Sequence, residues 1–290
     1  MSRLRRSVLF IAGSDEDALA LAGHAGADTV ILDLEDTVAP ARKQEARRLV
    51  VACLRDRSGP ATEYAVRVNA AASVEFRDDV DAVVAAGADA LVIPKTQNAD
   101  TLREIDTWLG SLEQRHGRRA AAVRLLPLIE TPAGVLNAAA IAVATPRIDA
   151  LVLGHVDLSR TLGVPETGAG AAIILHARAQ LVFAAKAAGI DAIDTVYMRD
   201  DDAGFESEAR QALALGFTGK LLVHPRQVDL VHAVYAPTAE DIDYARRLVA
   251  AFEAAEAAGQ GLFVFEGRVI DLPVVAAERT VLARARAAGL

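Results

Sequence analysis

Eight short apolar runs alternate with longer segments in which polar and apolar residues are interleaved. An apolar run between turn residues is typical of a strand buried on both faces, and the longer segments have the length and composition of helices. Strand–helix–strand units place consecutive strands in parallel pairs. The runs lie at residues 8–13, 29–35, 63–69, 90–95, 123–130, 150–158, 192–198 and 219–225.

The segments before several of these runs end in the related sequences HAGAD, AAGAD, AAGID and ALGF. Glycine is the residue that most readily takes the left-handed conformation that ends a helix, so each sequence predicts a helix that closes just before a strand. Eight βα units in succession favour a closed TIM (β/α)8 barrel over an open sheet. We therefore predict an α/β protein whose residues 1–235 form such a barrel.

Residues 236–290 follow a different pattern and predict a C-terminal helical segment. Thr238 and Asp241 have the spacing of a capping box at the start of an apolar helical stripe. A hairpin is expected to turn at Glu266 and Gly267, and Pro273 lies near the start of a last helix. Such a segment can act as a lid or pack on a neighbouring subunit, or it can simply close the barrel.

Two of the apolar runs, LLPLIE and ALVLGHVDL, carry carboxylates at their ends, Glu130 and Asp157. The C-terminal ends of parallel strands meet at one edge, so we expect these two side chains to lie close together. Carboxylate oxygens, completed by water and substrate oxygens, are the ligands that Mg²⁺ prefers. The alternative is that each acid caps the next helix or pairs with an arginine.

Polar side chains close the other runs as well, and barrel enzymes place their active sites at these strand ends. Any one of these residues has a structural explanation, such as an ion pair with a helix, but a ring of them at one rim favours a functional site. The ring consists of Gly13, Ser14, Asp33, Glu35, Asp36, Arg67, Asn69, Lys95, Glu130, Asp157, Arg199 and His224.

Charge and composition narrow the class of protein. A net charge of −8 argues against a general nucleic-acid or membrane-surface binder, although a local basic pocket for an acidic ligand stays open. Cys53 is the single cysteine, so a disulfide framework and a thiolate zinc site are both excluded. No run approaches the roughly 20 apolar residues of a membrane span, and the apolar part of MSRLRRSVLFIAG is short for a signal peptide. We expect a cytoplasmic protein.

Taken together, these segments resemble the citrate lyase β-subunit-like family within the aldolase and citrate lyase superfamily. The resemblance runs from RRSVLFIAGS to GRVIDLPVV, and LDLEDTV, IETPAGVLNA and HPRQ in that order are its most specific parts. It implies a TIM barrel with a C-terminal lid, assembled as a homotrimer or hexamer. It also implies Mg²⁺ and the acyl-CoA or acyl-carrier thioesters of hydroxy acids such as malyl, citramalyl and citryl.

The resemblance assigns expected roles to individual residues. Glu130 and Asp157 match the Mg²⁺ ligands of the family. Arg67 matches the residue that holds the keto-acid carboxylate and polarises its oxygen. Glu35 resembles the acid that orients a metal-bound water. Asp271 in VIDLP matches the lid acid that reaches a neighbouring site.

Other residues are expected to bind substrate. Lys43 and Arg47 in ARKQEAR are candidates for contacts with the CoA phosphates, and Lys95 and Gly154 are expected to line the substrate pocket. The family usually carries small or acidic residues before the metal-binding aspartate, whereas this chain has His155 and Val156. We therefore expect His155 to reshape the pocket that receives the acyl group.

The resemblance leaves several reactions in competition. The first is a Mg²⁺-dependent carbon–carbon lyase that converts a 3-hydroxyacyl-CoA thioester to acetyl-CoA and a 2-keto acid such as glyoxylate or pyruvate, or runs the condensation. The same groups would support an acyl-CoA thioesterase if water reached the carbonyl. The third candidate is a class II pyruvate aldolase. Asp271 argues against it, because that branch of the superfamily normally lacks the C-terminal lid that carries this residue. The fourth is a β-subunit that works only within a multi-subunit citrate lyase.

Overall fold

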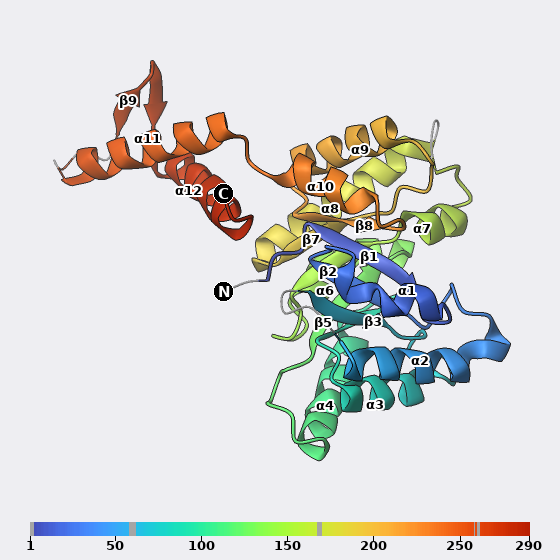
Figure 1. Cartoon of the computed structure of the whole chain (residues 1–290). Helices are drawn as coiled ribbons and strands as arrows, with labels where there is room; N and C mark the ends of the chain where they lie inside the picture. The colour runs from blue at the N-terminus through green and yellow to red at the C-terminus, as the bar shows by residue number, and fades with distance from the viewer. Residues whose placement is uncertain (1–2, 58–61, 167–169, 258, 260–261) are drawn as a thin grey trace. The chain divides into compact units, whose positions relative to one another are not determined.

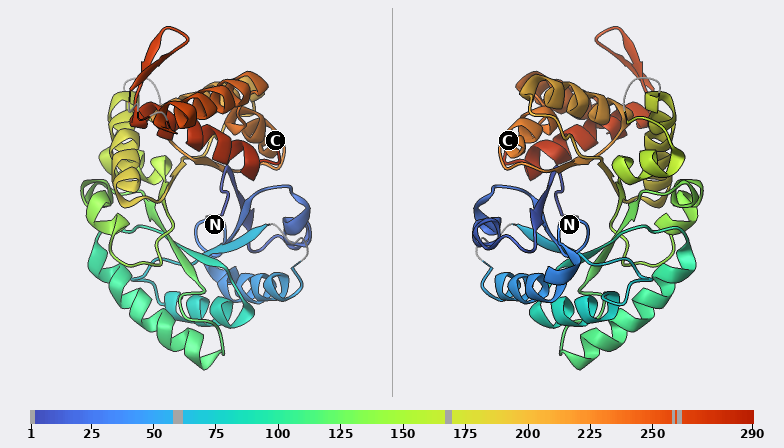
Figure 2. Two further views of the ribbon diagram at one scale, coloured as in Figure 1. Left: turned by 90° about the vertical axis from the view of Figure 1, so that its left-hand side faces the viewer. Right: turned by 90° about the vertical axis from the view of Figure 1, so that its right-hand side faces the viewer.

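The computed structural model describes residues 3–57, 62–166, 170–257, 259 and 262–290. Eight parallel strands pair in sequence order and β1 returns to β8, so they form the closed barrel that the sequence predicts (Figures 1 and 2). The strands are β1 (Ser7–Ala12), β2 (Thr29–Asp33), β3 (Glu63–Arg67), β4 (Ala90–Ile93), β5 (Arg124–Ile129), β6 (Ala150–Leu153), β7 (Asp191–Asp194) and β8 (Gly219–Leu222).

Helices follow the strands and surround the barrel (Figure 2). They are α1 (Glu16–Ala20), α2 (Lys43–Arg55), α3 (Phe76–Ala86), α4 (Ala99–Arg115), α5 (Pro132–Leu136), α6 (Ala138–Ala142), α7 (His155–Leu162), α8 (Ala171–Ala188), α9 (Asp202–Leu215) and α10 (Gln227–Tyr235), with 3-10 turns η1 (Ala22–His24) and η2 (Pro40–Arg42).

The glycine-ended segments behave as the sequence predicts. Gly87, Gly189 and Gly216 close α3, α8 and α9 in the left-handed conformation, and Gly26 has a positive φ after η1. A residue with a side chain would be strained there, which is why glycine recurs two or three positions before the first residue of the next strand.

Alternate strand residues fill the inside of the barrel. The buried cluster includes Ile31 of β2, Ala65 of β3 and Leu128 of β5, packed with small and branched side chains of the other strands. The residues two positions further along these strands, on the same face, are Asp33, Arg67 and Glu130. The apolar filling therefore ends where a layer of charged side chains begins, at the C-terminal end of the barrel.

The prediction of one strand over residues 150–158 is wrong in its second half. Strand β6 ends at Leu153, Gly154 is the N-cap, and α7 starts at His155. Asp157 therefore lies in the first turn of a helix and not at a strand end. The apolar letters of HVDL fit either structure, and a short run cannot separate them. The segment between β5 and β6 is also two short helices rather than one, α5 and α6.

Helix α8 meets the length and composition of a membrane-spanning helix. Its packing is that of a barrel helix, because residues such as Leu181 and Ala185 are buried. Arg178 on the same helix donates hydrogen bonds to both carboxylate oxygens of Asp194 in β7, each 3.0 Å long. A buried arginine that binds a strand residue fixes this helix against the sheet.

The chain divides into two compact units, Met1–Val234 and Tyr235–Leu290. The second unit contains α11 (Ala239–Ala257), the hairpin β9 (Phe263–Phe265) and β10 (Arg268–Ile270), and α12 (Leu272–Ala287). The predicted capping box is present, because the Asp241 backbone N–H donates to Thr238 Oγ1 at 3.0 Å and the Thr238 N–H donates back to Asp241 at 3.0 Å. Leu248, Phe252, Ile270 and Val275 form the unit's own apolar core.

Candidate active site

Arg67 at the end of β3 is held by the carboxylate at the end of β2. Its Nε donates to Asp33 Oδ1 at 2.6 Å and its Nη2 donates to Asp33 Oδ2 at 2.7 Å. Burial alone would raise the pKa of Asp33, but the two bonds from Arg67 outweigh it and hold that pKa below its usual range. The guanidinium also lies over the Phe10 ring, 4.7 Å from the ring centre. The side chain is thus fixed in plane and direction.

Glu35 lies beside this guanidinium, in the bend that follows β2. Its Oε2 is 3.3 Å from Arg67 Nη1, and its Oε1 accepts a hydrogen bond from Lys95 Nζ. Among the described residues Oε2 has no hydrogen-bond partner, although it is buried. Burial raises the pKa of Glu35, and the neighbouring charges of Arg67 and Lys95 oppose that shift without cancelling it.

Lys95 connects Glu35 to the next acid. Its backbone N–H donates to Glu130 Oε1 at 2.7 Å, and its φ of 52° lies in the left-handed region that non-glycine residues seldom adopt. Local strain of this kind persists only where surrounding contacts hold it in place, and it concentrates at functional sites. Here the strained residue supplies a backbone donor to one carboxylate and an ammonium to another.

Glu130, directly after β5, is a buried acid that is only 2% exposed. Burial, together with the negative charges of Glu35 and Asp157, raises its pKa to about 8 against the opposing effects of the Lys95 N–H and the Arg67 cation. Three carboxylates therefore share one region whose positive charge does not balance them. Asp157 thus lies near enough to influence Glu130, and the prediction that the two bind one cation stays a prediction.

Gly154 makes room for that buried acid. A Cβ at this position would lie 2.7 Å from Oε2 and 2.8 Å from Cβ of Glu130, which no side chain can tolerate without displacing the carboxylate. Its role in the structure is therefore to let β6 approach Glu130 closely, which is compatible with a place in the pocket wall.

Asp157 and His155 occupy the first turn of α7. Asp157 accepts a hydrogen bond from the exposed Arg160 on the next turn. His155 contacts Thr195 at the end of β7 through Nδ1, and its Nε2 is 3.3 Å from Glu166. Burial lowers the pKa of His155 despite the nearby acids. The imidazole thus ties the start of α7 to the end of β7.

Two of the expected CoA contacts bind other groups of the protein. Lys43 Nζ donates to the carbonyl oxygens of Leu34 and Glu35, at 2.7 and 2.6 Å. Arg47 donates to Asp79 at 2.7 Å and to Glu75, both on or beside α3. Lys43 therefore supports the loop that carries Glu35. The prediction that either residue binds CoA phosphates stays a prediction.

The other members of the predicted ring are less closely associated. Asp36 lies 3.7 Å from Lys95 Nζ, and Asn69 donates from Nδ2 to Leu34 O at 3.0 Å. His224 is exposed and accepts a hydrogen bond from its own loop, and Arg199 is exposed. Asp271 belongs to the second unit, where it is the N-cap of α12 and accepts from the Val274 N–H at 3.3 Å.

The chemistry of this donor set fits Mg²⁺. Glu130 and Asp157 carry hard oxygen atoms, and Oε2 of Glu35, which has no hydrogen bond among the described residues, is suited to accept one from a coordinated water. In the described ranges no group of three or more histidine, cysteine or acidic side chains converges as a closed metal site. Two carboxylates would leave most of the octahedral shell of Mg²⁺ to water and substrate oxygens.

Two residues of the site were given no individual role in the sequence analysis. Asp33 belonged to the ring only as a strand-end acid, yet it fixes the direction of Arg67. Its spacing of two from Glu35 could have placed both acids on one face of the chain. Thr195, which contacts His155, also lies two residues beyond the buried Ile193 of β7.

The chain is similar to proteins of one known family over most of its length. Residues 6–225 match the HpcH/HpaI aldolase/citrate lyase family. The chain is 40% identical over 290 residues to citrate lyase subunit beta of Escherichia coli strain K12, which covers 100% of this chain and 96% of that protein. It is 34% identical over 286 residues to the mitochondrial citramalyl-CoA lyase of Rattus norvegicus, covering 93% and 83% of the two chains.

Two further relatives concern thioester chemistry and magnesium. A (3S)-malyl-CoA thioesterase of Cereibacter sphaeroides strain ATCC 17023 is 37% identical over 294 residues and covers 97% of this chain and 95% of its own. The crystal structure of CitE from Mycobacterium tuberculosis, in complex with magnesium, acetoacetate and coenzyme A, matches with a TM-score of 0.78. That match has 32% identity and covers 98% of both chains.

Proposed function

Because the chain belongs to the HpcH/HpaI aldolase/citrate lyase family, we propose that it is a Mg²⁺-dependent carbon–carbon lyase acting on a 3-hydroxyacyl-CoA thioester. The substrate is of malyl, citramalyl or citryl type, and the products are acetyl-CoA and a small 2-keto acid. Relatives of lyase type and a magnesium, acetoacetate and coenzyme A complex of a relative support this proposal.

The observation that carries the proposal is the environment of Glu130. This carboxylate is buried beside Glu35 and Asp157, and its pKa is raised to about 8. A buried acid next to two other acids is unfavourable unless a cation compensates it. Glu130 and Asp157 would hold Mg²⁺, which when bound supplies Lewis-acid stabilisation of negative charge on the substrate oxygens.

Cleavage needs a proton to leave the 3-hydroxyl, the carbon–carbon bond to break, and its electron pair to form the enolate of the acetyl thioester. Arg67 would grip the carboxylate of the departing keto acid and direct Nη1 at its oxygen, because Asp33 already fixes the other side of the fork. Glu35, held by Lys95, would receive the hydroxyl proton through a water at Oε2.

The second half of the reaction needs an acid at the enolate carbon. We assign this role to Asp271 of a neighbouring subunit and propose that the C-terminal unit is a lid in a homotrimer or hexamer. The hairpin before Asp271 presents Val264 and Val269 to solvent, 67% and 62% exposed, and Leu272 beside it is exposed. Apolar side chains grouped in this way favour burial against another surface.

The main proposal is tested with the purified chain alone. Malyl-CoA and citramalyl-CoA are supplied with Mg²⁺, and keto acid, acetyl-CoA and free thiol are measured in parallel. A lyase releases keto acid and acetyl-CoA in equal amounts with no free thiol. Free thiol without keto acid would instead indicate a thioesterase, the second candidate, which the malyl-CoA thioesterase relative favours. Turnover that appears only with partner subunits would indicate a citrate lyase β-subunit.

The lid proposal is tested by mixing two inactive variants, Asp271→Asn and Glu130→Gln. If sites are shared, subunit exchange should form some sites that combine an intact barrel with an intact lid, and activity should return. A mixture that stays inactive, although labelled subunits are seen to exchange, would leave Asp271 as no more than the N-cap of α12. Light scattering on each variant gives the oligomeric state that exchange requires.

A further inference from the structure

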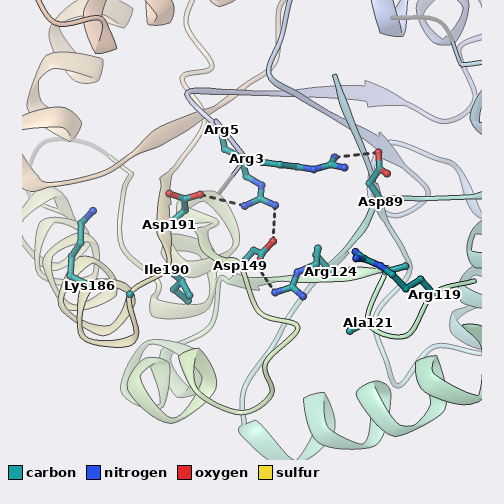
Figure 3. A pocket seen from close by; sticks show the side chains of 12 residues that line it. Arg3, Arg5, Asp89, Arg119, Ala121, Arg124, Asp149, Lys186, Ile190 and Asp191 are labelled. Atoms are coloured by element: carbon teal, nitrogen blue, oxygen red, sulfur yellow. Dashed lines mark hydrogen bonds and ion pairs between the residues drawn. The ribbon is translucent and has the colours of Figure 1, made fainter. Parts of the chain in front are cut away.

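A second polar cavity lies at the opposite end of the barrel from the candidate active site. It is formed where the strands begin, by the residues before β1 and β4, the first residues of β5 and β7, and the end of α8 (Figure 3). Its volume is about 670 Å³, within the range of small-molecule sites. Its charged lining consists of Arg3, Arg5, Arg119, Arg124, Lys186, Asp89, Asp149 and Asp191.

Each carboxylate of this lining lies close to at least one cation. Arg5 crosses the barrel end, where it lies 3.1 Å from Asp149 and 3.3 Å from Asp191 and also binds the buried Glu63 of β3. Burial would raise the pKa of Asp149, but Arg124 and Arg5 outweigh it and lower that pKa. Asp89 accepts from the Tyr64 backbone N–H at 3.0 Å and also lies close to cations. These pairs explain how the barrel end is closed.

Two cations of the lining remain outside this network. Arg119 and Lys186 are exposed, and in the described part of the chain neither side chain has a hydrogen bond or an ion pair, although Lys186 lies near enough to Asp191 to oppose the rise in that pKa. Figure 3 shows them on opposite sides of the cavity, with Arg5 and Asp149 between them. Five cations and three acids leave an excess of two positive charges on the lining, 5 − 3 = 2. The excess comes from the two unpaired side chains at its ends.

We propose that this cavity, termed here the basal cavity, binds a small multivalent anion with charged groups at both ends. A di- or tricarboxylate and a short polyphosphate share that chemistry. Arg119 would hold one end through its planar fork and Lys186 the other as a point charge. Concave walls that carry an excess of one charge concentrate counter-ions, so the whole lining contributes to capture.

This site is independent of the proposed lyase reaction. Arg5 and the strand beginnings separate it from Arg67 and Glu130, which follow the strand ends. Binding should therefore occur in metal-free protein and survive Glu130→Gln unchanged. If the lyase proposal fails, the proposal for the basal cavity is unaffected. If the basal cavity binds no anion, the lyase proposal is unaffected.

The test is isothermal titration of the metal-free full chain with tripolyphosphate and, separately, with tricarballylate at low ionic strength. Saturable binding of either anion supports the site, and the pattern of the two distinguishes phosphate from carboxylate ligands. Arg119→Glu and Lys186→Glu should each weaken binding about tenfold or more, as expected for loss of a charge-assisted contact.

Arg55→Glu is the matched control. Arg55 is an exposed cation in the last turn of α2, so it lies at the same end of the barrel but does not line the cavity. It should change binding by less than about twofold, since an exposed charge outside the site acts only through screened solvent. The proposal is overturned if neither anion binds saturably, or if Arg55→Glu weakens binding as much as the two cavity variants do.

Discussion

The buried charge of Glu130 should lower the free energy of unfolding of the metal-free protein at high pH. The substitution Glu130→Gln removes that charge and should restore the lost stability. The folded pKa of Glu130 is raised from 4.5 to about 8. Between these values the folded state binds more protons than the unfolded state, so stability falls as pH rises through this window. Glu130→Gln keeps the shape of the side chain and an acceptor for the Lys95 N–H but has no charge. The variant should therefore be more stable than the parent above pH 5, and increasingly so up to pH 8.

The size of the effect follows from the shift. A rise in pKa from 4.5 to about 8 gives a cost of roughly 1 kcal/mol at pH 5.5 and roughly 4 to 5 kcal/mol at pH 8.5. The advantage of the variant should thus grow by at most about 3 kcal/mol over this range. The assay is urea unfolding with EDTA at both pH values, followed by circular dichroism.

Glu113→Gln is the control with the opposite sign. Glu113 is equally buried, but it accepts two 2.7 Å bonds from Arg147 and two backbone N–H bonds, and these outweigh burial and lower its pKa. The same substitution should therefore destabilise the protein at both pH values. An advantage of Glu130→Gln that is absent at pH 8.5, or equal at both pH values, would refute the account of its environment.

Three further outcomes are expected. Arg67→Lys should lose activity far beyond what its retained charge suggests, because lysine cannot make the two-point contact with Asp33; near-normal turnover would contradict this. Gly154→Ala should weaken Mg²⁺ binding, measured by titration, because its Cβ would lie 2.7 Å from Glu130 Oε2. Gly110→Ala, where the nearest atom would be 3.9 Å away, is its control and should leave metal binding unchanged. Mg²⁺ should raise the melting temperature of the parent protein but not of Glu130→Gln, and an equal rise in both would exclude Glu130 as a ligand.

The fold could be predicted because each strand and helix is determined by a short stretch of the sequence. Apolar runs, helix lengths and closing glycines such as Gly87 and Gly216 all act over a few residues, and the structure confirms the eight strands that they indicated. The boundary at Gly154 was missed for the same reason. Residues 155–158 are compatible with either a strand or a helix, and the choice depends on contacts with Glu130 and Thr195 that lie far away in the sequence.

The charged layer was predictable in position but not in its pairing. The sequence places Asp33, Glu35, Arg67 and Glu130 near strand ends, but register decides which of them face each other. In the structure Asp33 is the direct partner of Arg67 across β2 and β3. That pairing takes one acid out of the set and leaves Glu35 and Glu130 as the buried acids with raised pKa. The same four residues shifted by one position would pair differently and turn away from the barrel interior. The excess of negative charge at Glu35 and Glu130, which indicates a cation, therefore depends on how the strands are aligned. That alignment is set only when the barrel closes.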